Sequence, residues 1–196
     1  MKHGRRGRGA ARPESRPLAR DRDRVGFGWT LTALGMVARA QGKGDLATQR
    51  LQDSLEVWHE VGDRQNTANV LNTLAALAWD EVDYETAHRR LRESLEILED
   101  IGDRRGIAFV VEGFACLAAA ERQGARAISL SAAAATLRRI VGAPSLPAWR
   151  LEVERNIETA RAVLPPDAVE KATVSGRAMT LQEAITLALG DREGGA

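Results

Sequence analysis

A forty-residue internal repeat restricts the folds open to this 196-residue chain more than any other feature. Residues 91–104 closely match residues 51–64, and small or apolar residues recur at the same step along the chain. The clearest columns are Gly62, Gly102 and Gly142; Ala47, Ala87 and Ala127; and Leu34, Leu74 and Phe114. Units of this length bury their apolar faces against neighbouring units. The sequence therefore predicts a stacked array of repeats.

Each unit contains two segments with the spacing of an amphipathic helix, because apolar residues recur three and four positions apart. The first segment is typified by Leu31, Leu34, Val37 and Ala38, and the second by Leu51, Leu55, Val57 and Val61. Gly62 and Gly102 suit the left-handed position that ends a helix. Asp63 and Asp103 follow directly and can cap the next helix. No segment alternates like a β-strand, so we predict an all-α solenoid of three helix pairs.

The unit resembles a tetratricopeptide repeat. In that family a small residue is followed twelve positions later by alanine, and the corresponding pairs here are Gly35 with Ala47, Ala75 with Ala87, and Ala115 with Ala127. The family's usual unit has 34 residues, so the forty-residue step implies a longer second helix in each pair. The resemblance implies a solenoid whose first helices line a concave face.

The N-terminal end has a composition unlike that of the repeats. Residues 1–24 hold nine basic and three acidic residues, and as far as Leu18 they are mainly Arg, Gly, Pro and Ala. Such a segment has little to bury and cannot offset the entropy of ordering. We predict a disordered basic tail over residues 1–21, followed by repeats over 22–143.

The C-terminal third departs from the repeat. The period ends after Gly142, where two prolines interrupt the chain, so we predict a helical cap over residues 144–190 and a frayed end over 191–196. Within the cap, the expected helices cover 148–163 and 167–175, and a capping box at Thr180 to Glu183 opens a third.

Several classes of function find no support in the sequence. One cysteine, Cys116, excludes an internal disulfide framework. No apolar run approaches the roughly 18 residues of a membrane span. Phosphate-binding, metalloprotease and nucleophile-elbow motifs are absent. We therefore expect a cytoplasmic protein that is not an enzyme and needs no cofactor and no metal.

The C-terminal part narrows the resemblance further. The last repeat begins at residues 106–118, continues through 132–144 and is followed by residues 176–189, which run from Gly176 to Leu189. This arrangement resembles the C-terminal region of large bacterial ATP-binding transcriptional regulators of the LuxR and SARP-associated types. The resemblance covers residues 22–190. It implies a regulatory module of such a protein, without its NTPase or DNA-binding parts.

What remains as a candidate site is the concave face that the resemblance implies. A mixture of aromatic, Met, Asn and charged side chains there suits recognition of a protein, a peptide or an effector. The predicted groove residues are Trp29, Thr32, Met36, Arg39, Asn69, Asn72, Trp79, Asp80, Phe109 and Glu112.

Other interpretations remain open at this point. The chain could be a stand-alone adaptor, or it could bind nucleic acid through its basic N-terminal arm. We do not expect nucleic acid to be a partner, because the arm has no aromatic residue for stacking on bases. The first repeat also has no preceding repeat to cover its apolar face, so self-association through that end is a further expectation.

Overall fold

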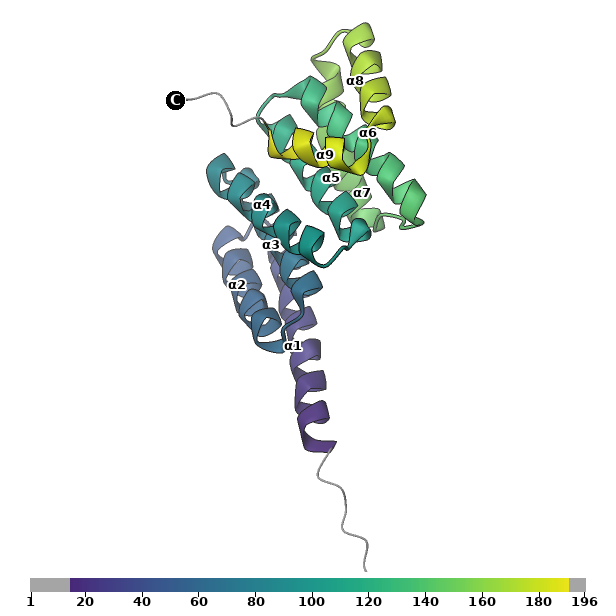
Figure 1. Ribbon diagram of the computed structural model, residues 1–196. Coiled ribbons are helices and arrows are strands. Elements are labelled where there is room, and N and C mark those ends of the chain that lie inside the picture. Colours follow the sequence, from purple (N-terminus) through teal and green to yellow (C-terminus); the bar gives the residue numbers. More distant parts are fainter. Residues whose placement is uncertain (1–14, 191–196) are drawn as a thin grey trace, which may run out of the picture.

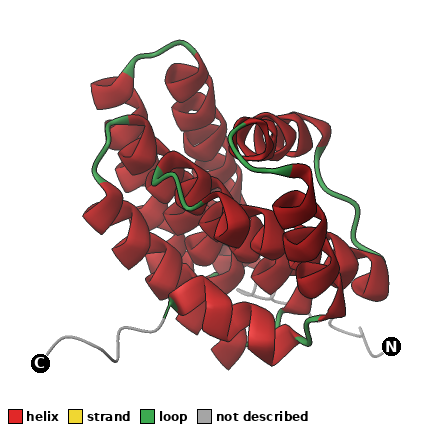
Figure 2. Cartoon of the chain, turned by 90° about the horizontal axis from the view of Figure 1, so that it is seen from above, coloured by secondary structure: helices red, strands yellow, loops and turns green. Residues whose placement is uncertain are grey.

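The computed structural model describes residues 15–190, with side chains from Asp23 onward. Within this range the chain forms helices and no strand, which confirms the predicted all-α class (Figures 1 and 2). The helices are α1 (Ser15–Ala40), α2 (Gly44–Val61), α3 (Arg64–Asp80), α4 (Tyr84–Asp100), α5 (Arg104–Ala120), α6 (Gly124–Val141), α7 (Pro147–Ala162), α8 (Pro166–Ala178) and α9 (Leu181–Leu189). None of these helices is long and apolar enough to cross a membrane.

The start of α1 corrects the predicted boundary of the tail. The helix begins at Ser15, so residues 15–21 are helical rather than disordered. The segment is compatible with a helix because Pro17 falls in the first turn, where proline is tolerated, and arginine, leucine and alanine are good helix formers. Residues 1–14 and 191–196, which the predictions assigned to the tail and the frayed end, lie outside the described residues.

Three antiparallel helix pairs form the body of the solenoid, as predicted: α1 with α2, α3 with α4, and α5 with α6. The predicted boundaries are confirmed. Gly62 ends α2 with a φ of 74°, and the Asp63 side chain accepts a hydrogen bond from the Asn66 amide at the start of α3. Asp103 caps α5 in the same way by accepting from the Arg105 amide.

Small residues let the two helices of a pair approach closely. A Cβ atom on Gly35 in α1 would lie 2.6 Å from Cγ of Leu51 in α2, so glycine is required there. Ala47, Ala87 and Ala127 are completely buried at the same place in successive second helices. These columns are therefore packing positions, and their recurrence reflects the repeated crossing of two helices.

Helix α7 corrects the prediction that the period ends after Gly142. It packs against α5 and α6 much as α5 packs against α3 and α4, and the forty-residue step carries Phe109 to Trp149 and Glu112 to Glu152. It is thus a fourth first helix, and it forms the innermost layer of the C-terminal cap.

The sequence of α7 does not show the usual pattern of a first helix, because α7 has no paired second helix. Ala115 and Ala118 of α5 are buried, but their counterparts Arg155 and Glu158 are exposed. The chain instead places α8 against α6. Gly176 lies inside α8, although the expected helix stopped at residue 175, and a Cβ atom there would overlap the carbonyl oxygen of Ser129 in α6.

Candidate recognition surface

The first helices α1, α3, α5 and α7 lie next to one another in this order, and the resemblance to tetratricopeptide repeats implies that they line the concave face. Four of the predicted groove residues are accessible to a partner there. Trp29 and Met36 of α1 are 53% and 49% exposed, Asp80 at the end of α3 is exposed, and Asn69 is partly buried. Trp29 also makes an edge-on contact with the buried Trp58 of α2, with ring centroids 5.5 Å apart. These four residues define the accessible concave patch.

Three other predicted groove residues are buried between helices, so their prediction as partner contacts is wrong. The Thr32 hydroxyl lies 2.7 Å from the Ser54 hydroxyl and donates to the Gly28 carbonyl, which ties α1 to α2. Asn72 is completely buried beside Gly113 of α5, and its amide has no hydrogen-bond partner among the described residues. Trp79 is only 6% exposed. Each occupies a helical face that meets a neighbouring helix rather than solvent.

Arg39, another predicted groove residue, forms two ion pairs within the chain. Its guanidinium donates to Asp80 at 2.7 Å and to Glu152 at 2.6 Å, and it lies 5.9 Å from the centroid of the Trp79 ring. Burial by itself would lower the pKa of Arg39, but the hydrogen bonds and charges of Glu152 and Asp80 outweigh it and raise the pKa. Arg39 therefore joins α1, α3 and α7.

A second polar cluster closes the concave face at its C-terminal end. Glu112 of α5 accepts two hydrogen bonds from Arg138 of α6, at 2.5 and 2.6 Å, and one from the indole of Trp149 at 2.6 Å. The Trp149 ring also packs edge-on against Phe109, with centroids 5.0 Å apart. Glu112 is thus buried and is wrong as a partner contact, whereas Phe109 packs against α7 but stays partly exposed.

Trp149, Glu152 and Arg138 are the residues that sequence reasoning missed on this face. A signal for two of them was present, because Trp149 and Glu152 stand one forty-residue period after Phe109 and Glu112. Arg138 carries no such signal, since its partner lies across a helix crossing rather than along the repeat.

Cys116 lies behind the same face and is completely buried. Burial raises the pKa of its thiol, and the nearby carboxylates of Glu152 and Glu112 raise it further. The thiol is therefore protonated and inert near neutral pH. Among the described residues, no group of three His, Cys, Asp or Glu side chains is arranged to hold a metal ion.

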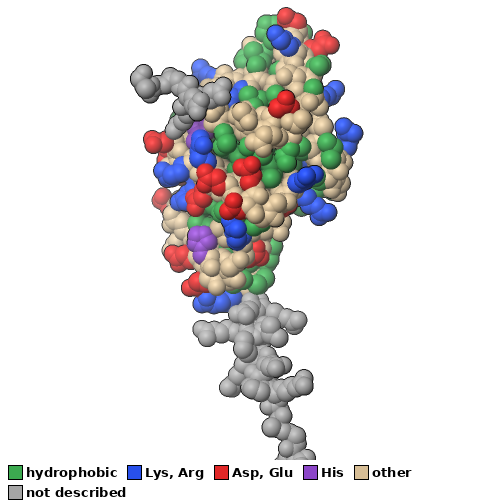
Figure 3. All heavy atoms as spheres, in the orientation of Figure 1, with side chains coloured by type: hydrophobic (Ala, Val, Ile, Leu, Met, Phe, Trp, Pro, Cys, Tyr) green, Lys and Arg blue, Asp and Glu red, His purple; other side chains and the backbone are tan. Residues whose placement is uncertain are grey.

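An open cleft of about 910 Å³ lies on another side of the molecule, between α4 and α9. Its walls carry Glu85, His88, Arg89 and Arg92 from α4 and Gln182, Glu183 and Thr186 from α9, with Gln123 and Arg126 at the start of α6. The cleft lining mixes both signs of charge, with Arg89, Arg92 and Arg126 beside Glu85 and Glu183. Basic and acidic side chains are likewise interspersed over the face of the molecule seen in Figure 3.

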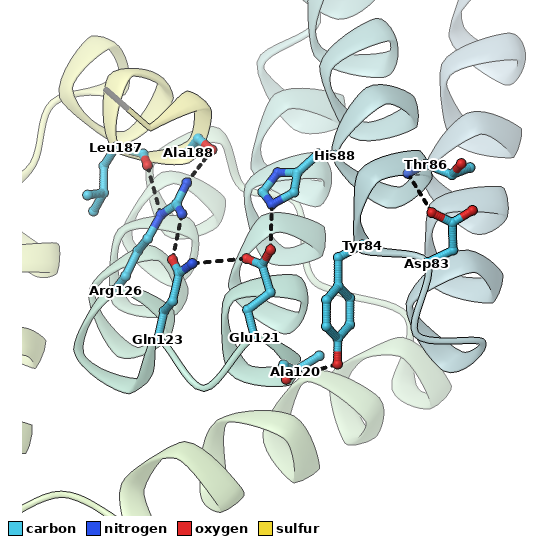
Figure 4. A network of polar contacts seen from close by, with 10 residues as sticks. All are labelled: Asp83, Tyr84, Thr86, His88, Ala120, Glu121, Gln123, Arg126, Leu187 and Ala188. Atoms are coloured by element: carbon cyan, nitrogen blue, oxygen red, sulfur yellow. Dashed lines mark hydrogen bonds and ion pairs between the residues drawn. The ribbon is translucent and has the colours of Figure 1, made fainter. Parts of the chain in front are cut away.

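A chain of hydrogen bonds holds the two walls of the cleft (Figure 4). His88 of α4 lies 2.9 Å from Glu121, Gln123 donates to Glu121, and Arg126 donates to Gln123 at 2.6 Å. Arg126 also donates to the carbonyl oxygens of Leu187 and Ala188, which fixes the end of α9. This cleft could not be predicted from the repeat, because α4 and α9 are not related by it.

The predicted capping box secures the other end of α9. Thr180 and Glu183 exchange the two hydrogen bonds of that motif, so this prediction is confirmed. The hydrogen bond from the Thr180 backbone amide lowers the pKa of Glu183, because it favours the charged carboxylate.

Comparison with known protein families identifies the repeats at the N-terminal end of the chain. Residues 27–100 match the family model described as tetratricopeptide repeat, a range that covers most of α1 through α4. No curated protein and no solved structure matches the chain. Together with the helix pairs, the family match supports a tetratricopeptide repeat protein. Such repeats generally mediate protein–protein interaction.

Proposed function

We propose that this tetratricopeptide repeat chain is a non-catalytic module that recognises a protein or peptide through its accessible concave patch. The exposure of Trp29 and Met36 is the observation that supports this most strongly. Large apolar side chains left in water beside polar groups are typical of the anchors of protein interfaces. The corresponding positions on α5 are packed against α7 or buried, so the open part of the face lies on α1 and α3.

The polar members of the patch suit an extended peptide. The Asn69 amide can both donate to and accept from a peptide backbone, which fixes orientation without requiring one side chain. Asp80 presents a carboxylate at the edge of the patch while it also binds Arg39. We therefore expect a ligand with one or two apolar anchors and a basic residue next to them.

The test is selection of ligands from a displayed peptide library on the full chain, followed by affinity measurement with variants. We expect Met36→Glu to weaken the selected peptides at least tenfold, because it places a charge where an apolar anchor packs. Ile140→Glu on α6 is a matched control, since Ile140 is exposed away from the patch. Equal affinities for the parent chain and Met36→Glu would overturn the proposal.

We further propose that the module is the regulatory part of a bacterial ATP-binding transcriptional regulator of the LuxR or SARP-associated type. The support for this proposal is the resemblance of residues 22–190, in which repeats are followed by a helical cap, to the C-terminal region of such regulators. Occupancy of the patch would act on the rest of the solenoid through Arg39, which binds residues of α3 and α7.

The size of the endogenous protein tests the regulator proposal. An antibody against residues 148–190 should detect a band much larger than the 21.3 kDa of this chain. A band near 21 kDa would contradict the regulator proposal and favour the stand-alone adaptor.

A further inference from the structure

The outer face of α1 carries apolar side chains whose counterparts in the next two repeats are buried. Phe27, Leu34 and Val37 are 57%, 49% and 53% exposed. The residues forty positions later are Thr67, Leu74 and Leu77, and those eighty positions later are Ile107, Phe114 and Leu117; none of these six exceeds 7% exposure. We call Gly26, Phe27, Leu34 and Val37 the outer α1 face. The three sets of residues occupy the same positions of the repeat. The difference in exposure therefore depends on whether another helix covers that face.

Second helices cover the equivalent faces of α3 and α5. The contact of α4 with α5 gives its detail: Leu91 and Leu98, seven residues apart, reach Gly113 and Gly106. A Cβ atom on Gly113 would lie 2.8 Å from the end of Leu91, and one on Gly106 would overlap Leu98. Gly26 is the counterpart of Gly106 on α1, and a Cβ atom there would meet nothing within 4 Å. The counterpart of Gly113 on α1 is Ala33, so α1 carries small residues at both positions where the leucines of α4 reach α5.

We propose that the outer α1 face binds an amphipathic helix of a partner polypeptide. The helix lies antiparallel to α1, as α4 lies against α5, and presents aliphatic side chains seven residues apart. This site is separate from the accessible concave patch and uses a different side of α1. Continuity with the α2–α3 and α4–α5 interfaces defines the occupant, since each of these faces is covered by an amphipathic second helix. Each of these second helices carries large apolar residues seven positions apart, Leu51 and Trp58 in α2 and Leu91 and Leu98 in α4.

Segments of this chain do not meet the requirement. Residues 1–14 and 191–196 contain no Leu, Ile, Val or Phe, so neither supplies aliphatic side chains seven residues apart. The second helices α2, α4 and α6 already pack against α3, α5 and α7. A second copy therefore has no free second helix among the described residues.

Direct pairing of two α1 helices is the rival arrangement, and the oligomeric state measured below distinguishes the two.

The probe for this site is a peptide of residues 80–103, which contains α4 with its natural Asp83 cap. A lactam bridge on its solvent-facing side holds it helical, because an isolated helix of this length is marginal in water. We expect saturable binding of the labelled peptide to the full chain by fluorescence anisotropy. Hydrogen exchange should slow over residues 26–40 when the peptide binds.

Two variants decide whether the outer α1 face is the site. Leu34→Glu should weaken peptide binding at least tenfold, and Leu151→Glu on α7 should change it less than twofold, since both leucines are exposed and tolerate a charge in the free chain. Circular dichroism checks that both variants fold. Absence of saturable binding, or binding that Leu34→Glu leaves unchanged, would overturn the proposal.

The oligomeric state tests the rival occupant. Light scattering coupled to size-exclusion chromatography should show a monomer for both the parent chain and the Leu34→Glu variant. A dimer that Leu34→Glu converts to a monomer would mean that a second copy occupies the face, and the partner-helix proposal would be wrong.

Discussion

Replacing Glu112 with glutamine should lower the free energy of unfolding by about 3 kcal/mol, because it removes one partner of a buried ion pair. The side chains of Glu112 and Arg138 are 9% and 14% exposed, so water does little to compensate for the lost charge. The Trp149 indole loses its charged acceptor in the same variant. Urea unfolding followed by circular dichroism measures the change.

A control on α7 makes the same chemical change in water. Glu154 pairs with Arg150 at 3.6 Å, and both side chains are more than 60% exposed. Glu154→Gln should cost less than about 1 kcal/mol, as expected for a surface ion pair. Similar losses in the two variants would mean that the Glu112 cluster does not hold α7 to the solenoid.

Trp58→Ala should cost about 3–5 kcal/mol through the cavity that it leaves. Trp58 is completely buried, and its ring lies against Gly28, where a Cβ atom would be 2.8 Å away. Because repeats are stabilised by their neighbours, we expect the loss to fall on the first pair. Hydrogen exchange should accelerate across α1 and α2 and change little in α5 and α6.

His59→Ala is the matched control for this variant, since His59 is the next residue on α2 and is exposed. Its exchange pattern should equal that of the parent chain. Uniform acceleration over all helices in Trp58→Ala would contradict a locally stabilised first repeat.

The repeat made much of the fold predictable. Some residue types are set by local requirements at the ends of helices. Gly62 adopts the left-handed conformation that ends a helix, and Asp63 and Asp103 accept hydrogen bonds from backbone amides at the start of the next helix. These requirements recur with the period, so the helix ends and pairs could be placed. A helix at the position of α7 was predicted, but its role as a first helix was missed, because the residues that mark a first helix, such as Ala115, contact a second helix that α7 lacks.

The candidate site was harder to predict, because whether a side chain is exposed depends on which helices pack beside it. Asn72 and Asn69 stand three residues apart on α3, yet one is buried against α5 and the other is partly accessible. The ion pair between Arg39 and Glu152 joins residues 113 positions apart. No local pattern reports such a contact, so Arg39 appeared as a free groove residue when it is a structural link.

Mapping a selected peptide on the full chain by hydrogen exchange tests the recognition function most directly. We expect protection on α1 and α3 around Trp29, Met36, Asn69 and Asp80, with exchange in α4 and α9 unchanged. Protection confined to the cleft between α4 and α9, with the concave patch exchanging as in the free chain, would contradict this expectation.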